Sequence, residues 1–297
     1  MFLGTSPFLR GEFEPRRRLR ELLAKSEPLL APGCYDALGA RLVEEAGFDA
    51  VYMTGFGSSA SRLGRPDVGL LTMPEMVENA RLIVEAVDLP VIADADTGYG
   101  NPINVIRTVQ AYERAGVAAI HLEDQVAPKK CGHYAEHELI SAEEMVHKLR
   151  AALDTREKML IIARTDARGH SSLEEAIRRG RLYAEAGADL VFVEAPRSRQ
   201  EIEEIARSIP GPLLINMFEG GRTPLIPAAE LAELGYRLVI MPSDLQRAAI
   251  HGMQLAAATL RRDGSSAAIA DRLASFEERD EIIGLAQWSE LEKRYGD

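Results

Sequence analysis

Eight short apolar segments constrain the fold of this chain more than any other feature of its sequence. They are residues 28–33, 49–55, 89–96, 117–124, 158–167, 188–195, 212–217 and 236–242. Continuous apolar runs of this length are typical of parallel strands that are buried on both faces of a sheet. Since helical patterns separate the runs, this order predicts an α/β protein built as a (β/α)8 barrel, or TIM barrel.

The segments between these runs carry the signals that begin and end helices. Three of them end in a glycine, as helices often do: Gly47, Gly187 and Gly235. Two begin with the capping-box pattern: Ser141 with Glu144, and Ser172 with Glu175. The alternative to a barrel is an open, doubly wound sheet, but no Gly-x-Gly-x-x-Gly turn follows the first apolar run.

The C-terminal part of the chain holds more helical sequence than one barrel unit needs. We expect residues 1–297 to form a single barrel domain. Residues 244–297 would then be a helical extension that packs on a neighbouring subunit.

Charge and cysteine content narrow the possible partners. The formal net charge is −11, which argues against nucleic acid or an anionic membrane surface as a partner. Two cysteines, Cys34 and Cys131, argue against a disulfide scaffold and fit a reducing compartment. No segment is apolar enough to cross a bilayer, and the N-terminus lacks the apolar stretch of a signal peptide. We therefore expect a cytoplasmic protein.

Carboxylates stand at the ends of two neighbouring predicted strands, where barrel enzymes place their active sites. Asp94 and Asp96 are two residues apart, so a strand would point both to the same face, and Glu123 ends the next strand. Such a cluster of oxygen ligands suits Mg²⁺ or Mn²⁺. The alternative is a network in which these acids pair with nearby basic side chains: Arg164, Lys129 or His121.

Two further strand ends offer groups that could hold an anionic substrate. Arg164 could bind a substrate carboxylate, or it could form a salt bridge with Glu194 or Asp166. The turn Thr54–Gly57 could hold a carboxylate with its backbone N–H groups, or it could simply be a tight loop.

Cys131 lies between Lys129 and His133, in the loop after the fourth predicted strand. Nearby positive charges lower the pKa of a thiol, and Gly132 would let the loop move, so Cys131 could transfer a proton when the loop closes. A nucleophilic cysteine and an inert loop cysteine are the alternatives. Cys34 has no charged neighbours of this kind and is expected to pack in the interior.

Three motifs together resemble the isocitrate lyase/phosphoenolpyruvate mutase superfamily. They are "DADTGYGN" (94–101), "HLEDQVAPKKCGH" (121–133) and "IARTDA" (162–167). Within it, the Lys-Lys-Cys-Gly-His loop is similar to that of the carbon–carbon lyases that act on 2-methylisocitrate and 2,3-dimethylmalate. Carboxyphosphonoenolpyruvate mutases can carry the same loop. The segment "NMFEGGRTP" (216–224) lacks the serine-rich pattern of isocitrate lyases, which argues against isocitrate. Phe192 resembles the smaller aromatic residue of the 2-methylisocitrate group, and this resemblance implies room for an alkyl group.

The resemblance implies a role for each residue of the site. It implies Mg²⁺ near Asp94, with Asp96 and Glu123 holding its water shell and Asp67 as a supporting acid. It implies that Thr54, Gly55 and Phe56 bind one substrate carboxylate and that Arg164 binds the oxo-acid portion. Glu194 and Asn216 match further substrate-binding positions. It also implies a homotetramer, a dimer of dimers whose last barrel helix is exchanged between subunits.

The expected reaction is cleavage of a substituted 2-hydroxy dicarboxylic or tricarboxylic acid to a 2-oxo acid and a second carboxylic acid. Tyr52, a metal-bound hydroxide or a carboxylate would remove the hydroxyl proton. Lys129 and His133 would stabilise the developing enolate, and Cys131 would protonate the carbanion. The alternatives are phosphonate mutase chemistry, oxaloacetate hydrolysis or decarboxylation, and a non-catalytic barrel that binds an oxo acid.

Overall fold

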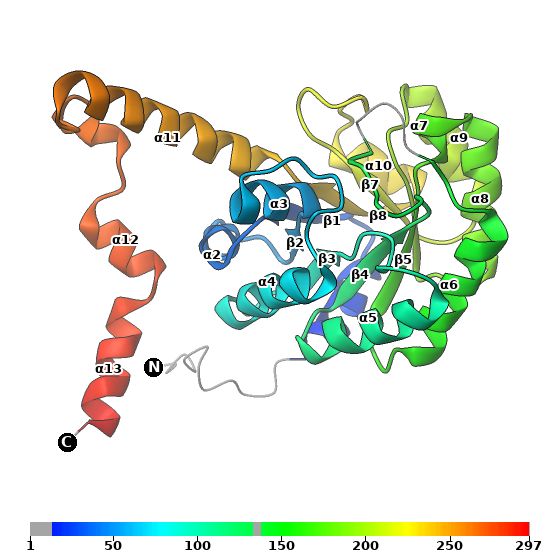
Figure 1. Cartoon of the computed structure of the whole chain (residues 1–297), viewed down its shortest axis with the longest axis horizontal. Helices are drawn as coiled ribbons and strands as arrows, with labels where there is room; N and C mark the ends of the chain where they lie inside the picture. Colours follow the sequence, from blue (N-terminus) through cyan, green and yellow to red (C-terminus); the bar gives the residue numbers. More distant parts are fainter. Residues whose placement is uncertain (1–13, 133–137, 297) are drawn as a thin grey trace.

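The computed structural model, which describes residues 14–132 and 138–296, is a closed barrel of eight parallel strands (Figure 1). The strands are β1 (Leu29–Cys34), β2 (Val51–Met53), β3 (Val91–Asp94), β4 (Ala119–Glu123), β5 (Leu160–Thr165), β6 (Leu190–Val193), β7 (Leu213–Asn216) and β8 (Tyr236–Met241). Each lies within the predicted run or passes its end by one residue. Because β1 pairs with β8, with Leu29 opposite Leu238, the sheet is closed, and the alternative of an open sheet is wrong.

Helices surround this barrel and cover its N-terminal end. They are α1 (Pro15–Leu23), α2 (Ala37–Glu45), α3 (Gly55–Leu63), α4 (Met73–Ala86), α5 (Pro102–Arg114), α6 (Ala142–Thr155), α7 (Ala167–His170), α8 (Leu173–Glu185), α9 (Arg199–Ser208) and α10 (Ala228–Leu234). The three predicted terminal glycines all have positive φ: Gly47, Gly187 and Gly235. Ser141 and Ser172 cap α6 and α8 by accepting the N–H of Glu144 and Glu175. The Glu175 carboxylate binds Arg178 and Arg179.

Two apolar clusters leave only one end of the barrel open for a site. The larger cluster lies between the sheet and the surrounding helices, and the smaller one fills the barrel interior. The smaller cluster includes Leu19 and Leu22 of α1, packed with residues at the starts of strands such as Leu29 and Leu190. Since α1 thus covers the N-terminal ends of the strands, the C-terminal ends remain for function, as in other barrels of this type.

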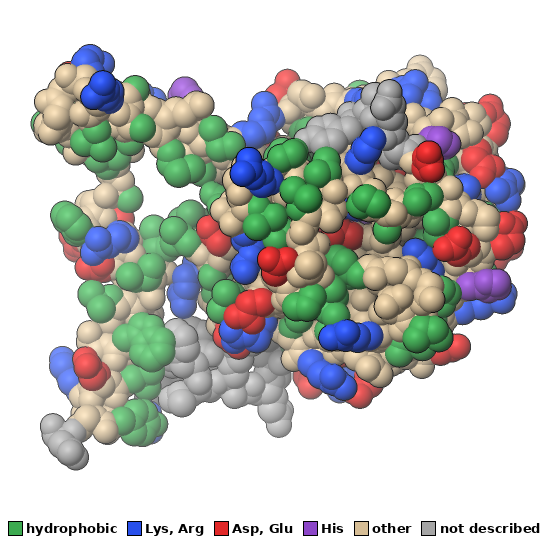
Figure 2. Space-filling model, in the orientation of Figure 1, with side chains coloured by type: hydrophobic (Ala, Val, Ile, Leu, Met, Phe, Trp, Pro, Cys, Tyr) green, Lys and Arg blue, Asp and Glu red, His purple; other side chains and the backbone are tan. Residues whose placement is uncertain are grey.

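The C-terminal segment forms an arm that leaves the barrel (Figure 1). It consists of α11 (Asp244–Asp263), a 3₁₀ helix η1 (Ala267–Arg272), α12 (Phe276–Ile282) and α13 (Leu285–Tyr295). Several large apolar side chains of the arm are exposed (Figure 2): Met253, Phe276, Leu285, Trp288 and Tyr295. In the part of the chain that the structure describes, no helix is both long and apolar enough to cross a membrane.

Gly33 is required where β1 meets the end of β8. A Cβ atom at Gly33 would lie 2.5 Å from the Cα atom of Pro242, which is backbone and cannot rotate away. We expect Gly33→Ala to lower the free energy of unfolding by ~1–3 kcal/mol, the usual cost of overpacking. Gly252→Ala in α11, where nothing lies within 4 Å of the added atom, is the control and should be neutral or stabilising. Urea unfolding of both variants tests this, and equal stabilities would contradict it.

Candidate active site

A cavity of about 700 Å³ lies at the C-terminal ends of the strands. Most of the residues that we singled out from the sequence line it: Tyr52, Thr54, Phe56, Asp67, Asp94, Lys129, Cys131, Arg164, Phe192, Glu194 and Asn216. Gly55, Asp96 and Glu123 lie directly behind this wall, each against a lining residue: Asp94, Lys129 and Arg164, respectively. His133 lies outside the described residues.

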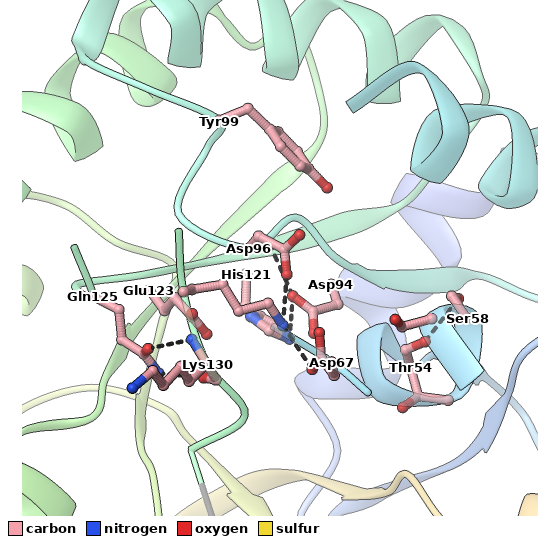
Figure 3. Close-up of polar contacts among 12 residues, drawn as sticks. Thr54, Ser58, Asp67, Asp94, Asp96, Tyr99, His121, Glu123, Gln125 and Lys130 are labelled. Atoms are coloured by element: carbon pink, nitrogen blue, oxygen red, sulfur yellow. Dashed lines mark hydrogen bonds and ion pairs between the residues drawn. The ribbon is translucent and has the colours of Figure 1, made fainter. Parts of the chain in front are cut away.

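Asp94 and Asp96 reach the site from different backbone conformations. Asp94 is the last residue of β3, whereas Asp96 follows the strand with φ of +49°. The Asp96 N–H donates to Asp94 Oδ1 at 2.9 Å, which closes the turn. We predicted that both side chains share a face because side chains alternate along a strand. That reason is wrong, since Asp96 does not belong to the strand. The turn, and not the pleat, brings both carboxylates to the site (Figure 3).

Lys129 joins two carboxylates from separate loops. Its ammonium group lies 2.7 Å from Asp67 Oδ2 and 2.8 Å from Asp96 Oδ1. Burial alone would lower the pKa of Lys129, but the surrounding carboxylates, Asp96 first, raise it well above its ordinary value. The Lys129 ammonium group, which we expected to lower the pKa of Cys131, is therefore paired with carboxylates. This is the alternative that we considered from the sequence.

The charge balance of the buried groups favours a cation. Six carboxylates are almost fully buried around the cavity floor: Asp67, Asp94, Asp96, Glu123, Asp166 and Glu194. Lys129 and Arg164 oppose them through ion pairs of 4 Å or less, and His121 Nε2 lies 3.7 Å from Asp94 Oδ1. Glu123 Oε1 has no hydrogen-bond partner in the described chain, and burial raises the Glu123 pKa well above its ordinary value. An uncompensated buried carboxylate is costly, so a divalent ion fits here.

The carboxylates are not arranged as a closed cage. Within the described ranges, no three His, Cys, Asp or Glu side chains come close enough to hold one ion together. Mg²⁺ usually keeps several of its waters and takes only one or two carboxylates directly. The donor set therefore fits an ion bound by one carboxylate, with the other acids placed to hold its waters.

His121 and Tyr52 form a buried pair. Figure 3 shows His121 beside Asp94, and His121 Nε2 lies 3.7 Å from Asp94 Oδ1. The Tyr52 hydroxyl lies 2.8 Å from His121 Nε2, and burial lowers the pKa of His121 to about 4. His121 is then neutral near pH 7, so it does not act as the positive partner of the acids that we considered from the sequence. Burial raises the Tyr52 pKa well above its ordinary value, so Tyr52 keeps its proton unless a neighbour accepts it.

The Thr54–Gly57 segment is the start of α3 and not a simple turn. Thr54 caps this helix by accepting the Gly57 N–H at 3.2 Å. The N–H groups of Gly55 and Phe56 have no acceptor inside the helix, and helix N-termini attract anions. A Cβ atom at Gly55 would overlap the Asp94 carboxylate, so glycine is needed for Asp94 to reach this place.

Arg164 is oriented by acids on several sides. Its Nε and Nη2 atoms donate to both oxygens of Asp166 at 3.0 and 2.8 Å, and Nη1 lies 3.3 Å from Glu123. Its guanidinium carbon lies 5.3 Å from the centre of the Phe192 ring. The salt bridges that we considered as an alternative role are present, but Arg164 also lines the cavity.

Cys131 lies on the cavity wall and Cys34 does not. Cys131 is half-buried, and its N–H donates to the Asp67 carbonyl at 3.1 Å. Gly132 packs so closely on the Arg164–Asp166 pair that an added Cβ atom would lie 2.6 and 2.5 Å from their side-chain atoms. Close packing is therefore a second reason for this glycine. Cys34 is completely buried, as predicted, and burial raises the pKa of its thiol.

Comparison with known protein families gives a clear match over most of the chain. A family model described as phosphoenolpyruvate phosphomutase matches residues 19–261. The chain belongs to this family. The resemblance drawn from the three sequence motifs is thereby confirmed.

Curated relatives in the phosphomutase family include two lyases. The chain is 51% identical to a 2,3-dimethylmalate lyase of Eubacterium barkeri, over 94% of this chain and 97% of the relative. It is 45% identical to a 2-methylisocitrate lyase of Aeropyrum pernix, over 99% and 92% of the two chains.

Solved structures of this family superpose over nearly the whole chain. A 2,3-dimethylmalate lyase superposes with a TM-score of 0.90 at 40% identity, covering 97% of this chain and 96% of the other. An oxaloacetate acetylhydrolase bound to 3,3-difluorooxalacetate gives 0.90 at 37%, covering 96% and 98%. A phosphonopyruvate hydrolase bound to oxalate and Mg²⁺ gives 0.87 at 34%, covering 95% and 99%.

Proposed function

We propose that this member of the phosphomutase family is a Mg²⁺-dependent carbon–carbon lyase. Its substrate would be a substituted 2-hydroxy dicarboxylic or tricarboxylic acid, similar to 2,3-dimethylmalate or 2-methylisocitrate. The observation that carries this proposal is the presence of Asp94, Arg164 and Cys131 on the wall of one cavity. These supply a metal ligand, a carboxylate-binding group and a proton donor for a carbon atom. Relatives with 51% and 45% identity are named for such reactions.

The acidic floor of the cavity is the proposed metal site. Asp94, which lines the cavity, would bind Mg²⁺ directly, while Asp96 and Glu123 would hold its waters. Asp67 would support them by holding Lys129. When bound, Mg²⁺ or Mn²⁺ supplies positive charge that lowers the pKa of a 2-hydroxyl group.

The residues of the chain would bind and orient the substrate between the two ends of the cavity. Thr54 and the N–H groups of Gly55 and Phe56 would bind one carboxylate, and Arg164 would bind the oxo-acid portion. Glu194 and Asn216 are neighbours, with Asn216 Nδ2 3.5 Å from the Glu194 carboxylate, and would contact the substrate beside Arg164.

Proton transfers would complete the reaction on the two sides of the broken bond. Tyr52 and a carboxylate are the candidate bases. Burial raises the pKa of Tyr52 and lowers that of His121, its hydrogen-bond partner, so this pair favours a protonated Tyr52 and leaves the carboxylate as the better base. Electrons of the carbon–carbon bond would pass to the departing fragment as a carbanion, which Lys129 and His133 would stabilise. Cys131 would give its thiol proton to that carbon and be left as a thiolate.

Two other reactions use a similar site. Neighbours with TM-scores of 0.90 and 0.87 are named oxaloacetate acetylhydrolase and phosphonopyruvate hydrolase. A panel of 2,3-dimethylmalate, 2-methylisocitrate, isocitrate, oxaloacetate and phosphonopyruvate, assayed with Mg²⁺ for release of the oxo acid, distinguishes them. We expect the first or second substrate to give the highest kcat/KM. Preference for oxaloacetate or the phosphonate would replace the lyase proposal, and binding without turnover would indicate a non-catalytic barrel.

Gly55→Ala tests the link between the carboxylate site and the metal site. The added methyl group would push the Asp94 carboxylate aside, so we expect Mg²⁺ affinity to fall at least about tenfold, a loss of ~1.4 kcal/mol. Isothermal titration calorimetry measures the affinity directly. Gly252→Ala is the control, and unchanged affinity in Gly55→Ala would separate Asp94 from the metal.

The exposed arm is proposed to be an oligomer interface. Phe276 and Trp288 are 77% and 48% exposed, which is unusual for such large apolar side chains. A neighbouring subunit in a homotetramer, built as a dimer of dimers with exchanged C-terminal helices, would cover them. Light scattering of the purified chain should give four times the monomer mass, and a monomer at micromolar concentration would refute this assembly.

A further inference from the structure

Asp124 is a buried carboxylate that the proposed reaction does not use. It follows Glu123 directly after β4, is completely buried, and does not line the cavity. Its Oδ2 atom accepts hydrogen bonds from α8 and β5: from Arg179 Nη1 at 2.9 Å, Tyr183 Oη at 2.8 Å and Thr165 Oγ1 at 2.7 Å. So many donors on one carboxylate indicate a rigid position.

The other oxygen of Asp124 holds the residue that orients Arg164. Asp124 Oδ1 accepts the backbone N–H of Asp166 at 3.0 Å. The Asp166 side chain in turn binds two nitrogens of Arg164. A change at Asp124 would therefore move the Asp166 backbone and, through it, the guanidinium group that lines the cavity.

Asp124 and Arg179 together also fix the start of the segment that carries Cys131. The Asp124 carbonyl accepts the Ile140 N–H at 3.0 Å, and Arg179 Nη1 donates to the Ile140 carbonyl at 3.0 Å. Gln125 pairs with Leu139 next to this point. The chain from Gln125 to Gly132 therefore starts from a place that Asp124 and Arg179 determine together.

We propose that Asp124 and Arg179 are positioning residues that hold Arg164 and Cys131 at a fixed position relative to each other. This inference rests on the lyase function proposed above. The two parts that they place are in contact, because Gly132 packs on Arg164 and Asp166. Displacements of about 1 Å can cost an enzyme roughly 10²-fold in rate, so a shared anchor for both groups matters for catalysis.

Arg178 and Arg179 provide a matched pair of substitutions. Both bind Glu175, but only Arg179 reaches Asp124, and the Arg178 side chain is half exposed. We expect Arg179→Met to lower kcat for 2,3-dimethylmalate at least about tenfold and to weaken oxalate binding in the presence of Mg²⁺ at least fivefold. Arg178→Met should change both by less than twofold. Arg179→Lys, which keeps one donor and the charge, should restore part of the loss.

Tyr183→Phe is a milder second variant, which tests the proposal even if Arg179→Met fails to fold. It removes one hydrogen bond to Asp124 and keeps the ion pair, so kcat and oxalate affinity should fall in the same direction by a smaller factor. All measurements are made well below the unfolding midpoint. If Arg179→Met and Tyr183→Phe lower only the midpoint and leave kcat and oxalate affinity within twofold, the residues are merely structural and the proposal is wrong.

Alkylation of Cys131 gives a readout that does not depend on turnover. Because Cys34 is completely buried, iodoacetamide should report on Cys131. Oxalate with Mg²⁺ should slow alkylation of the unmodified chain at least fivefold, and Tyr183→Phe should reduce this protection at least twofold. Equal protection in both would refute the positioning role. An unmodified chain that shows this protection but cleaves no substrate of the panel would refute the lyase function alone.

Discussion

Cys131→Ser is expected to lower the turnover of the hydroxy-acid substrate by about 10²–10⁴-fold, the usual contribution of a positioned general acid. A serine hydroxyl is a far weaker acid than a thiol, so it cannot deliver a proton to the carbanion at the same rate. Cys131 lines the cavity and its backbone is bonded to Asp67, so the shape of the wall should be preserved. The measurement is kcat with saturating Mg²⁺ and substrate.

Binding measurements separate the loss of proton transfer from a loss of structure. Mg²⁺ and oxalate affinities should stay within twofold in Cys131→Ser, because the substitution replaces one atom and keeps the hydrogen bonds that hold Asp94 and Arg164 in place. Cys34→Ala, which changes the other cysteine in the apolar core, should keep its turnover. Turnover near that of the unmodified chain in Cys131→Ser would remove this thiol from the mechanism.

Asp94→Ala should abolish the metal-dependent activity, with a loss of at least about 10³-fold in kcat/KM. The proposed ion contributes several kcal/mol of charge stabilisation, and each 1.4 kcal/mol corresponds to about tenfold in rate. Burial by itself would raise the pKa of Asp94, but His121, which is protonated only at acid pH, together with Lys129 and Arg164 outweighs it and holds the pKa to about 2. Asp94 is therefore ionised near neutral pH and ready to bind a cation.

Thermal unfolding gives a second test of Asp94 that does not need substrate. Mg²⁺ should raise the unfolding midpoint of the unmodified chain by mass action and leave that of Asp94→Ala unchanged. Without Mg²⁺, the variant should be at least as stable, because it removes one charge from a cluster with excess carboxylates. Asp88→Ala, at an exposed carboxylate, is the control. Activity that persists in Asp94→Ala or in excess chelator would exclude the metal site.

The main differences between prediction and structure occur where a strand or helix ends. Residues 49–55 read as one apolar strand, but β2 stops at Met53 because Thr54 caps α3. Asp96 reads as a strand residue, but it lies in a left-handed turn. The helical pattern near the C-terminus is divided at Gly284, which has a φ of +75°. These ends depend on single hydrogen bonds and dihedral angles, which hydrophobic periodicity does not encode.

Three residues of the network behind the site have roles that the sequence did not indicate. Arg179 lies in an ordinary amphipathic helix, Asp124 is one of several polar residues at the end of its strand, and Asp166 was considered only as a salt-bridge partner of Arg164. Their importance depends on Asp124 accepting bonds from β5 and α8 at once. Such a network joins residues far apart in the chain and can be recognised only when their distances are known.

The sequence by itself determined the number and order of the barrel strands, and it predicted the end of the barrel where the cavity lies and the charged residues on its floor. It could do so because burial on both faces of a parallel strand demands a continuous apolar run, and polar residues at its end stand out against that run. Only the tertiary structure decided the pairing of Lys129 with Asp67 and Asp96, the neutral state of His121, and the shared anchor at Asp124. Charge state and hydrogen bonding depend on burial and on partners within a few ångströms, which the folded chain brings together from distant parts of the sequence.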